Sequence, residues 1–221
     1  MTLILEPGEP PAEDWHGASL THLASTLVPD DCPRAIVAVD GRQGAGKSTL
    51  AAGLARTWTD AGRAAGIVHT DDLAWWQGFF TWDHLLVDGV LRPWASGQSV
   101  AFRPPAWVER GREGAIEADG AASILIVEGV GSSRTTLGPW LQSAVWLQAD
   151  RSDARRRGLA RDGGAPETEA FWDEWDAAER DFLADDRPWE RASVIACGTP
   201  GVLGLALGAD EVLLAHPTHA R

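Results

Sequence analysis

The segment from Gly41 to Thr49 holds the residues of this sequence that are best suited to chemistry. It reads Gly-Arg-Gln-Gly-Ala-Gly-Lys-Ser-Thr, a glycine-rich run that ends in a lysine and two hydroxyl residues. Backbone N–H groups in such a loop surround an anion, and the start of a following helix adds positive partial charge. We expect a nucleotide's phosphates to be bound by Gly41, Gln43, Gly44, Ala45, Gly46, Lys47, Ser48 and Thr49.

Lys47 is the only lysine among the 221 residues, and the other 18 basic side chains are arginines. A compact ammonium fits between phosphates where a planar guanidinium does not, so we interpret Lys47 as a catalytic residue that cannot be exchanged. In this pattern the lysine reaches the β- and γ-phosphates, and the hydroxyl of Ser48 binds Mg²⁺. The sequence therefore predicts ATP and Mg²⁺ as cofactors.

Alternating strand and helix patterns surround this loop. We expect strands near residues 35–39, 66–69, 123–127, 144–147 and 193–196, and helices near residues 16–27, 46–61, 152–161 and 167–183. The region 71–116 contains Pro93, Pro104 and Pro105 and is expected to be irregular. This order predicts an α/β fold with an open parallel sheet of about five strands flanked by helices, and ligands at the carboxyl ends of the strands. A strand before the loop and helical spacing after it argue against a chance glycine-rich turn.

Acidic residues follow two of the expected strands. Asp71 and Asp72 come after the strand near residues 66–69, and Glu128 ends the apolar run 124–127. Asp71 could take a proton from an attacking hydroxyl, whereas Asp72 and Glu128 could hold Mg²⁺. Any one of these acidic residues could instead form a turn or cap a helix. Two acidic sites at strand ends beside a phosphate loop favour a catalytic or metal-binding role.

Five arginines follow the expected strand near residues 144–147. They are Arg151, Arg155, Arg156, Arg157 and Arg161. A lid over residues 151–164 would place some of these guanidinium groups on a transferring phosphoryl group and exclude water. The alternative is a solvated basic face balanced by nearby aspartates.

Charge and hydropathy exclude several classes of partner. The formal net charge of −13 argues against binding to nucleic acid, which depends on basic residues that neutralise phosphates. No apolar run approaches the length of a membrane span, and the N-terminal residues lack a basic start. We expect a cytoplasmic protein, a monomer or homodimer, with a small-molecule acceptor as its partner.

Taken in order along the chain, these features resemble uridine kinase-like P-loop kinases. The resemblance spans roughly Ile36 to Pro200, within an expected domain core of residues 34–200. It rests on the phosphate loop, Asp71, Trp82-Asp83-His84, Val127-Glu128-Gly129 and the arginine-rich segment. It implies a single P-loop kinase domain over residues 1–221 with an acceptor-binding region at 71–116. It also implies that Asp71 is the general base, that Asp83 holds sugar hydroxyls, and that Arg157 and Arg161 act from the lid.

The chain departs from this family where the acceptor would bind. The family has a Tyr-Asp-Phe segment and then a base-contacting His, whereas this chain has Pro105-Ala106-Trp107 and then Arg110. Trp107 and other aromatic residues, Trp75, Trp76, Phe79 and Phe80, could stack on a planar base or simply pack in the core. The candidate acceptor residues are Asp83, Arg103, Trp107 and Arg110.

The resulting hypothesis is an ATP- and Mg²⁺-dependent kinase that moves the γ-phosphoryl group to a small molecule, with nucleosides or nucleotides leading. A sugar, a pantothenate-like or an antibiotic hydroxyl is the alternative acceptor. A regulatory P-loop ATPase without kinase activity is the alternative class. The sequence contains no Asn and no second Lys, so it lacks the Asn/Thr-Lys-x-Asp element of guanine-specific switches.

Overall fold

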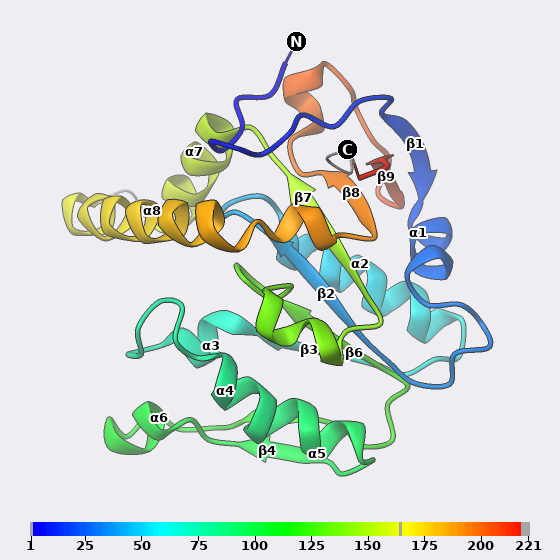
Figure 1. The fold of residues 1–221 in the computed structure, drawn as a ribbon, viewed down its shortest axis with the longest axis vertical. Coiled ribbons are helices and arrows are strands. Elements are labelled where there is room, and N and C mark those ends of the chain that lie inside the picture. Colours follow the sequence, from blue (N-terminus) through cyan, green and yellow to red (C-terminus); the bar gives the residue numbers. More distant parts are fainter. Residues whose placement is uncertain (1, 164, 218–221) are drawn as a thin grey trace.

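A seven-stranded β-sheet runs through the centre of the molecule (Figure 1). The computed structural model describes residues 2–163 and 165–217. The strands lie in the order β1-β9-β8-β7-β2-β6-β3. They are β1 (His16–Ser19), β2 (Ala35–Gly41), β3 (Ala65–His69), β6 (Ile124–Glu128), β7 (Ser143–Gln148), β8 (Val194–Cys197) and β9 (Glu211–Ala215). The five from β8 to β3 are parallel, which confirms the predicted α/β fold. At one edge β9 pairs antiparallel with β8, and β1 pairs antiparallel with β9.

Helices connect these strands and cover both faces of the sheet. The α-helices are α1 (Leu20–Leu27), α2 (Lys47–Asp60), α3 (Thr70–Ala74), α4 (Asp83–Leu86), α5 (Arg92–Ala95), α6 (Pro105–Glu109), α7 (Arg151–Arg161) and α8 (Pro166–Asp186). A π-helical turn spans Val87–Leu91, and 3₁₀ turns span Thr135–Trp140, Pro188–Arg191 and Pro200–Leu203. A separate pair of antiparallel strands, β4 (Val100–Phe102) and β5 (Ile116–Ala118), lies beside α4 to α6.

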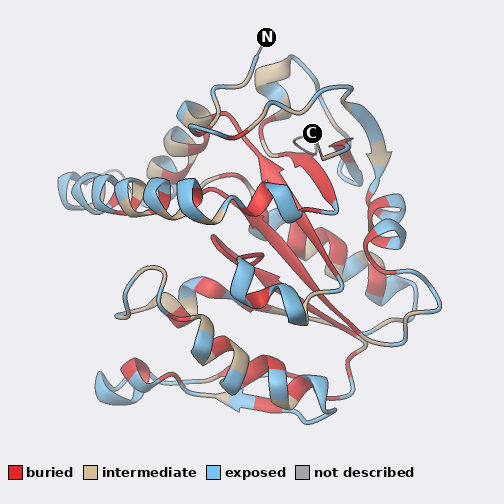
Figure 2. Ribbon diagram, in the orientation of Figure 1, coloured by how far each residue is buried: buried red, intermediate tan, exposed pale blue. Residues whose placement is uncertain are grey.

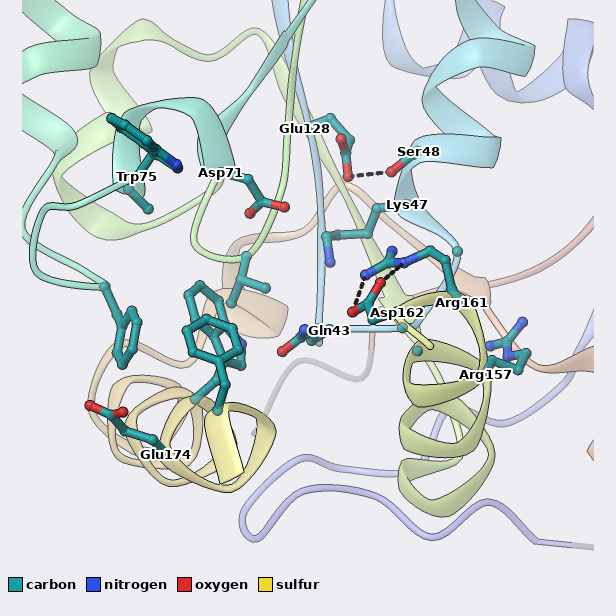
Figure 3. A pocket seen from close by; sticks show the side chains of 18 of the residues that line it. Gln43, Lys47, Ser48, Asp71, Trp75, Glu128, Arg157, Arg161, Asp162 and Glu174 are labelled. Carbon is teal, nitrogen blue, oxygen red and sulfur yellow. Dashed lines mark hydrogen bonds and ion pairs between the residues drawn. The ribbon is translucent and has the colours of Figure 1, made fainter. Parts of the chain in front are cut away.

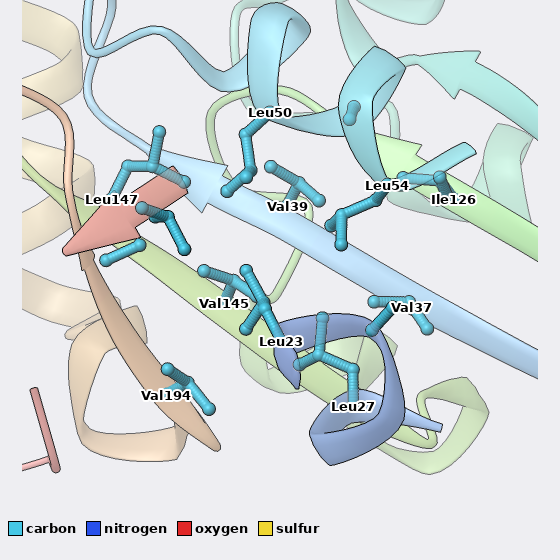
Figure 4. Close-up of a cluster of buried hydrophobic side chains, with 14 of the residues drawn as sticks. Leu23, Leu27, Val37, Val39, Leu50, Leu54, Ile126, Val145, Leu147 and Val194 are labelled. Carbon is cyan, nitrogen blue, oxygen red and sulfur yellow. The ribbon is translucent and has the colours of Figure 1, made fainter. Parts of the chain in front are cut away.

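The core follows from the alternation of side chains along the central strands. Every residue of β2, β6 and β7 is buried (Figure 2). Successive side chains of a strand point to opposite faces, so Val37 and Val39 pack with α1 and α2 (Figure 4), whereas Ile36 packs with the segment 73–141. Trp146 of β7 belongs to a third cluster with residues from the end of α8. A sheet buried on both faces holds its strand ends rigidly, and the site is built on those ends.

Two expectations about secondary structure were wrong. Residues 16–19 of the predicted N-terminal helix form β1, because Ser19 caps the helix and its Oγ accepts a hydrogen bond from the His22 N–H at 3.1 Å. The region 71–116 is ordered rather than irregular, with four helices and two strands. Pro105 occupies the first turn of α6, whereas Pro93 lies where the π-helical turn Val87–Leu91 passes into α5 within one continuous helical run.

Two predicted boundaries fall outside the described residues. The expected lid 151–164 ends at Gly164, and the expected domain 1–221 begins and ends beyond the described chain. Within the described residues, α7 supplies the helix that was predicted for the lid.

Candidate functional site

The phosphate loop connects β2 to α2 in the conformation that its glycines require. Gly46 has φ of +99° and caps α2, whose first residue is Lys47. Gly44 has φ of +76°, and a Cβ there would collide with the backbone carbonyl of Ala154 in α7. Glycine at this position therefore serves both the turn of the loop and the close approach of α7.

Lys47 points back into its own loop. Its side chain is buried, and its Nζ donates a hydrogen bond to the Arg42 carbonyl oxygen at 3.0 Å. This contact holds the ammonium between the loop and the cavity in front of it (Figure 3). The lysine is thus positioned beside the backbone N–H groups that surround an anion in such loops.

Asp40, the residue before Gly41, fixes the base of the loop. It is fully buried and accepts hydrogen bonds from the Gly41 N–H at 2.7 Å, the Gly131 N–H at 2.9 Å and the Ser133 Oγ at 2.7 Å. Burial raises the pKa of the Asp40 carboxyl, and the hydrogen bonds from Ser133 oppose the shift. The carboxylate ties the loop to the segment that follows β6, a role that sequence analysis missed.

Glu128 connects three elements at the carboxyl ends of the strands. The parallel register places it opposite both Val39 of β2 and His69 of β3. Its Oε1 accepts a hydrogen bond from the Ser48 Oγ at 3.2 Å, and its Oε2 lies 2.6 Å from the Nδ1 of His69. Burial would raise the pKa of Glu128, but His69, Lys47 and Ser48 together hold it below its ordinary value.

Ser48 and Glu128 fit the Mg²⁺ site that the sequence predicted. A hydroxyl and a carboxylate supply the oxygen ligands that Mg²⁺ prefers, and this ion usually takes its other ligands from phosphates and water. Within residues 2–163 and 165–217, no group of three or more His, Cys, Asp or Glu side chains is placed to hold a metal by itself. The donor set therefore suits a metal ion that is bound together with a nucleotide.

A cavity of about 1040 Å³ opens in front of the phosphate loop. Many of the predicted site residues line it: Gln43, Gly44, Gly46, Lys47, Ser48, Thr49, Asp71, Glu128, Arg157 and Arg161. In Figure 3, Asp71 lies between Trp75 and Lys47, and the two arginines project from α7. Five elements or connections of the fold thus converge on one space.

Asp71 is the titratable group at the centre of this space. Asp71 is exposed to the open cavity, yet the protein around its carboxyl desolvates it enough to raise its pKa, while Lys47 opposes the shift and Glu128 adds to it. A carboxyl with a raised pKa is a stronger base when ionised, so its environment suits proton acceptance.

Two of the five arginines of the expected lid face the cavity. The Nη2 of Arg157 donates to the Gly198 carbonyl oxygen at 3.0 Å, and Arg161 pairs with Asp162, which raises the Arg161 pKa. Among the described residues, the other three do not line the cavity, and each pairs with a carboxylate. Arg151 pairs with Asp176, Arg155 with Asp173 and Arg156 with Asp153.

Several predicted site residues are placed elsewhere by the fold. Of the described residues, those that line the cavity include neither Asp72 nor the four acceptor candidates. Asp72 pairs with Arg112 at 2.5 Å instead of facing a metal. Asp83 accepts a hydrogen bond from Thr136 at 2.7 Å, Arg103 donates to the Arg112 carbonyl, Trp107 donates to the Asp72 carbonyl and Arg110 stacks on Trp76. Gly41 and Ala45 belong to the loop but also do not line the cavity.

Helix α8 contributes a wall that sequence analysis missed. Phe171, Glu174 and Trp175 line the cavity opposite the phosphate loop, together with aromatic residues of the segment 75–79. Phe171 and Trp175 lie one helical turn apart, and that spacing is the signal in the sequence that could have identified a common face. Nothing in the spacing indicates that the face turns toward the phosphate loop.

A buried charge network joins α8 to the loop from behind. Arg42 lies 2.9 Å from Glu6, 2.9 Å from Asp176 and 3.4 Å from Glu179. The Gln43 N–H donates to Glu179 at 2.6 Å. Burial raises the pKa of Glu179, and Arg42 opposes this shift. The network fixes the first half of the phosphate loop against a helix more than a hundred residues away in the sequence.

Comparison with solved structures supports the assignment of the fold. No protein-family model and no curated protein matches this chain. A "possible uridine kinase" from Bacillus stearothermophilus superposes with a TM-score of 0.55 and 20% sequence identity, covering 80% of this chain and 96% of the other. A "putative fructose transport system kinase" from a Silicibacter species gives a TM-score of 0.52 and 20% identity, covering 87% of this chain and 98% of the other.

The superposition includes 96% of one neighbour and 98% of the other, so the likeness extends well beyond the phosphate loop. None of the described helices is both long enough and apolar enough to span a membrane. At this level of identity the likeness establishes the architecture. The chain shares the α/β fold of these two proteins, with a mostly parallel sheet flanked by helices.

Proposed function

We propose that this protein is an ATP- and Mg²⁺-dependent kinase that transfers the γ-phosphoryl group of ATP to a hydroxyl group of a small molecule. The observation that carries the proposal is the convergence of Lys47, Asp71 and Arg161 on one cavity, beside the hydrogen-bonded pair of Ser48 and Glu128. Phosphoryl transfer needs positioning and charge stabilisation more than covalent chemistry, and these are the groups that supply both.

Each group has a distinct part in the proposed reaction. The loop N–H groups and Lys47 bind the phosphates, and Arg157 and Arg161 stabilise charge that accumulates on the transferring group. Asp71 accepts the proton of the attacking hydroxyl, for which its raised pKa suits it. Ser48 and Glu128 would hold Mg²⁺, which neutralises phosphate charge when bound.

The acceptor that the sequence predicted first, a nucleoside or nucleotide, has less support. Asp83 and Arg110 carried that prediction, and both are engaged with other protein groups outside the described cavity wall. The names of the two neighbours refer to a nucleoside and to a sugar, and the folds are alike. The acceptor therefore has to be argued from the cavity of this chain.

A coupled assay of ADP release with a panel of candidate acceptors tests the kinase proposal. We expect ADP release by the wild type to rise when a productive acceptor is added, and Lys47→Ala to show no such rise. A slow ADP release that no hydroxyl-bearing acceptor changes would contradict the proposal and favour the regulatory ATPase.

A further inference from the structure

One side of the cavity, formed by the segment after α3 and by α8, is built from aromatic rings. Trp75, Trp76 and Phe79 come from the segment after α3, and Phe171 and Trp175 come from α8. Phe79 packs edge-on against Trp175 with ring centroids 4.8 Å apart, and against Phe171 at 6.0 Å. We call these five residues the aromatic end.

The aromatic end is open to an incoming molecule. Trp76 is 64% exposed and Phe171 is 49% exposed, although both are large apolar side chains. Water contact with such rings is unfavourable, and a planar ligand stacked on them would recover that cost. Apolar exposure inside a concave site is typical of ligand binding.

The charges around the aromatic end are negative. Among the described residues, those that line this end include one carboxylate, Glu174, and no Lys or Arg. Asp71 lies between this end and Lys47 (Figure 3). An anionic group on the acceptor would therefore approach two carboxylates without a cation to pair with, which is unfavourable in a partly desolvated site.

Two arginines near the aromatic end stack on its tryptophan rings. The Arg110 guanidinium lies 3.8 Å from the ring centroid of Trp76. Arg112 lies 5.1 Å from that of Trp75 and also pairs with Asp72. Neither arginine is among the residues that line the cavity, and each is engaged with a ring by stacking.

From this arrangement we infer that the acceptor is an alcohol with an apolar, planar body and without a phosphate or carboxylate group. The body stacks on the aromatic end and the hydroxyl reaches Asp71, where its proton is taken. This inference rests on the proposed kinase function and narrows its acceptor. It sets nucleotides and phosphorylated sugars aside, because the anionic groups of these molecules have no partner at this end.

Calorimetric binding of matched probes tests the inference. The full chain is first saturated with Mg²⁺ and the ATP analogue AMP-PNP, then titrated with 2-naphthalenemethanol, 2-naphthoic acid or uridine monophosphate. The first two probes share one planar body and differ in charge. We expect the alcohol to bind at least about tenfold more tightly than either anion. Equal or tighter binding of an anion, or no binding of the alcohol to the nucleotide-loaded protein, would overturn the inference.

Variants locate the binding and separate the two proposals. Glu174 is an exposed helix residue, so Glu174→Arg should fold and should shift the ratio of affinities toward the naphthoate by about threefold or more. Phe79→Ala should weaken binding of the alcohol by about tenfold. Trp140→Ala, a half-buried aromatic outside this cavity wall, is the matched control and should change neither value. An unchanged ratio in Glu174→Arg would overturn the inference even if the alcohol binds. Failure of AMP-PNP to bind would instead count against the kinase proposal itself, before any acceptor is added.

Discussion

Among single residues, Lys47 has the most specific role in the proposed transfer. Lys47 is the single lysine of the sequence, and its Nζ donates a hydrogen bond to the Arg42 carbonyl oxygen inside the phosphate loop. Lys47 is packed closely against the loop and is only 8% exposed, although it lines the cavity. A larger planar cation would have to displace the loop backbone in order to occupy the same place.

We therefore expect Lys47→Ala nearly to abolish phosphoryl transfer and Lys47→Arg to fail to restore it. Steady-state turnover in the coupled ADP assay measures both variants, and thermal unfolding checks that each remains folded. Near-normal turnover of Lys47→Arg would contradict the role assigned to the ammonium.

Asp71 gives a prediction about pH. An aspartate accepts a proton only when it is ionised, and the raised pKa of Asp71 moves this requirement to higher pH than for an ordinary aspartate. We expect kcat to fall as pH decreases through this raised pKa. Asp71→Asn should lower kcat by about 10² or more and remove the acidic limb, with little change in ATP affinity.

The neighbouring residue is the matched control for this variant. Asp72 pairs with Arg112 and does not line the cavity wall as described, so Asp72→Asn should keep both kcat and the acidic limb. A larger loss of kcat in Asp72→Asn than in Asp71→Asn would show that the base has been assigned to the wrong carboxylate.

At the scale of elements, α7 depends on its packing against the loop and α8. Gly158 of α7 faces the ring of Trp172 in α8 so closely that a Cβ would overlap the indole. Trp172 is 1% exposed and has no room to move aside. The position of α7 in turn determines where Arg157 and Arg161 stand.

Gly158→Ala should therefore destabilise the fold by about 1–3 kcal/mol and lower kcat more than it weakens ATP binding. Chemical denaturation and steady-state kinetics measure the two effects. The double variant Gly158→Ala with Trp172→Phe makes room for the added methyl group and should recover part of both losses. If the single variant keeps full stability and kcat, the packing of α7 does not position its arginines.

The buried network of Arg42 and Glu179 makes a second prediction about elements. Glu179→Gln keeps the size of the side chain but removes the charge that faces Arg42 and weakens the acceptor of the Gln43 N–H. We expect a loss of about 1–3 kcal/mol in unfolding free energy and weaker binding of AMP-PNP. Glu169→Gln, an exposed change on the same helix, is the control. If Glu179→Gln leaves the affinity for AMP-PNP unchanged, the network stabilises the fold but does not contribute to nucleotide binding.

Some of the strands could be predicted from sequence patterns and others could not. The five parallel strands could be predicted because each is a short apolar run before a turn, and Asp71 and Glu128 could be placed because they follow such runs. Strand β1 could not be predicted, since its residues His16 to Ser19 are polar or small and three of the four are exposed. Its pairing with β9 depends on chain ends that are distant in sequence.

The wall formed by α8 was equally hidden from the sequence. A helical pattern shows which residues share a face but not what the face meets. Asp83 and Arg110 were placed in the acceptor site from a resemblance, whereas the fold gives them partners of their own in Thr136 and Trp76. Local spacing therefore predicted which phosphate-loop residues lie at the cavity better than it predicted which acceptor candidates do.

At the scale of the whole molecule, segments from both ends of the chain support the central sheet. Near the N-terminus, Glu9 accepts hydrogen bonds from the Trp146 indole at 2.7 Å and from the Gln148 amide at 3.0 Å, both on β7. Glu6 pairs with Arg42 at the loop. The N-terminal segment thus contacts both the strand and the loop from which the cavity is built. The chain as a whole is acidic, with a formal net charge of −13, so the arginines near the cavity are a local group of positive charge.

Transfer of an isotopically labelled γ-phosphoryl group tests the central claim most directly. The full chain is incubated with Mg²⁺, γ-labelled ATP and a planar, uncharged alcohol that binds it, and the products are separated and identified by mass spectrometry. The account predicts label on the hydroxyl oxygen of the alcohol, in an amount that depends on Lys47 and Asp71. Label found only in inorganic phosphate, at a rate that no acceptor changes, would contradict it.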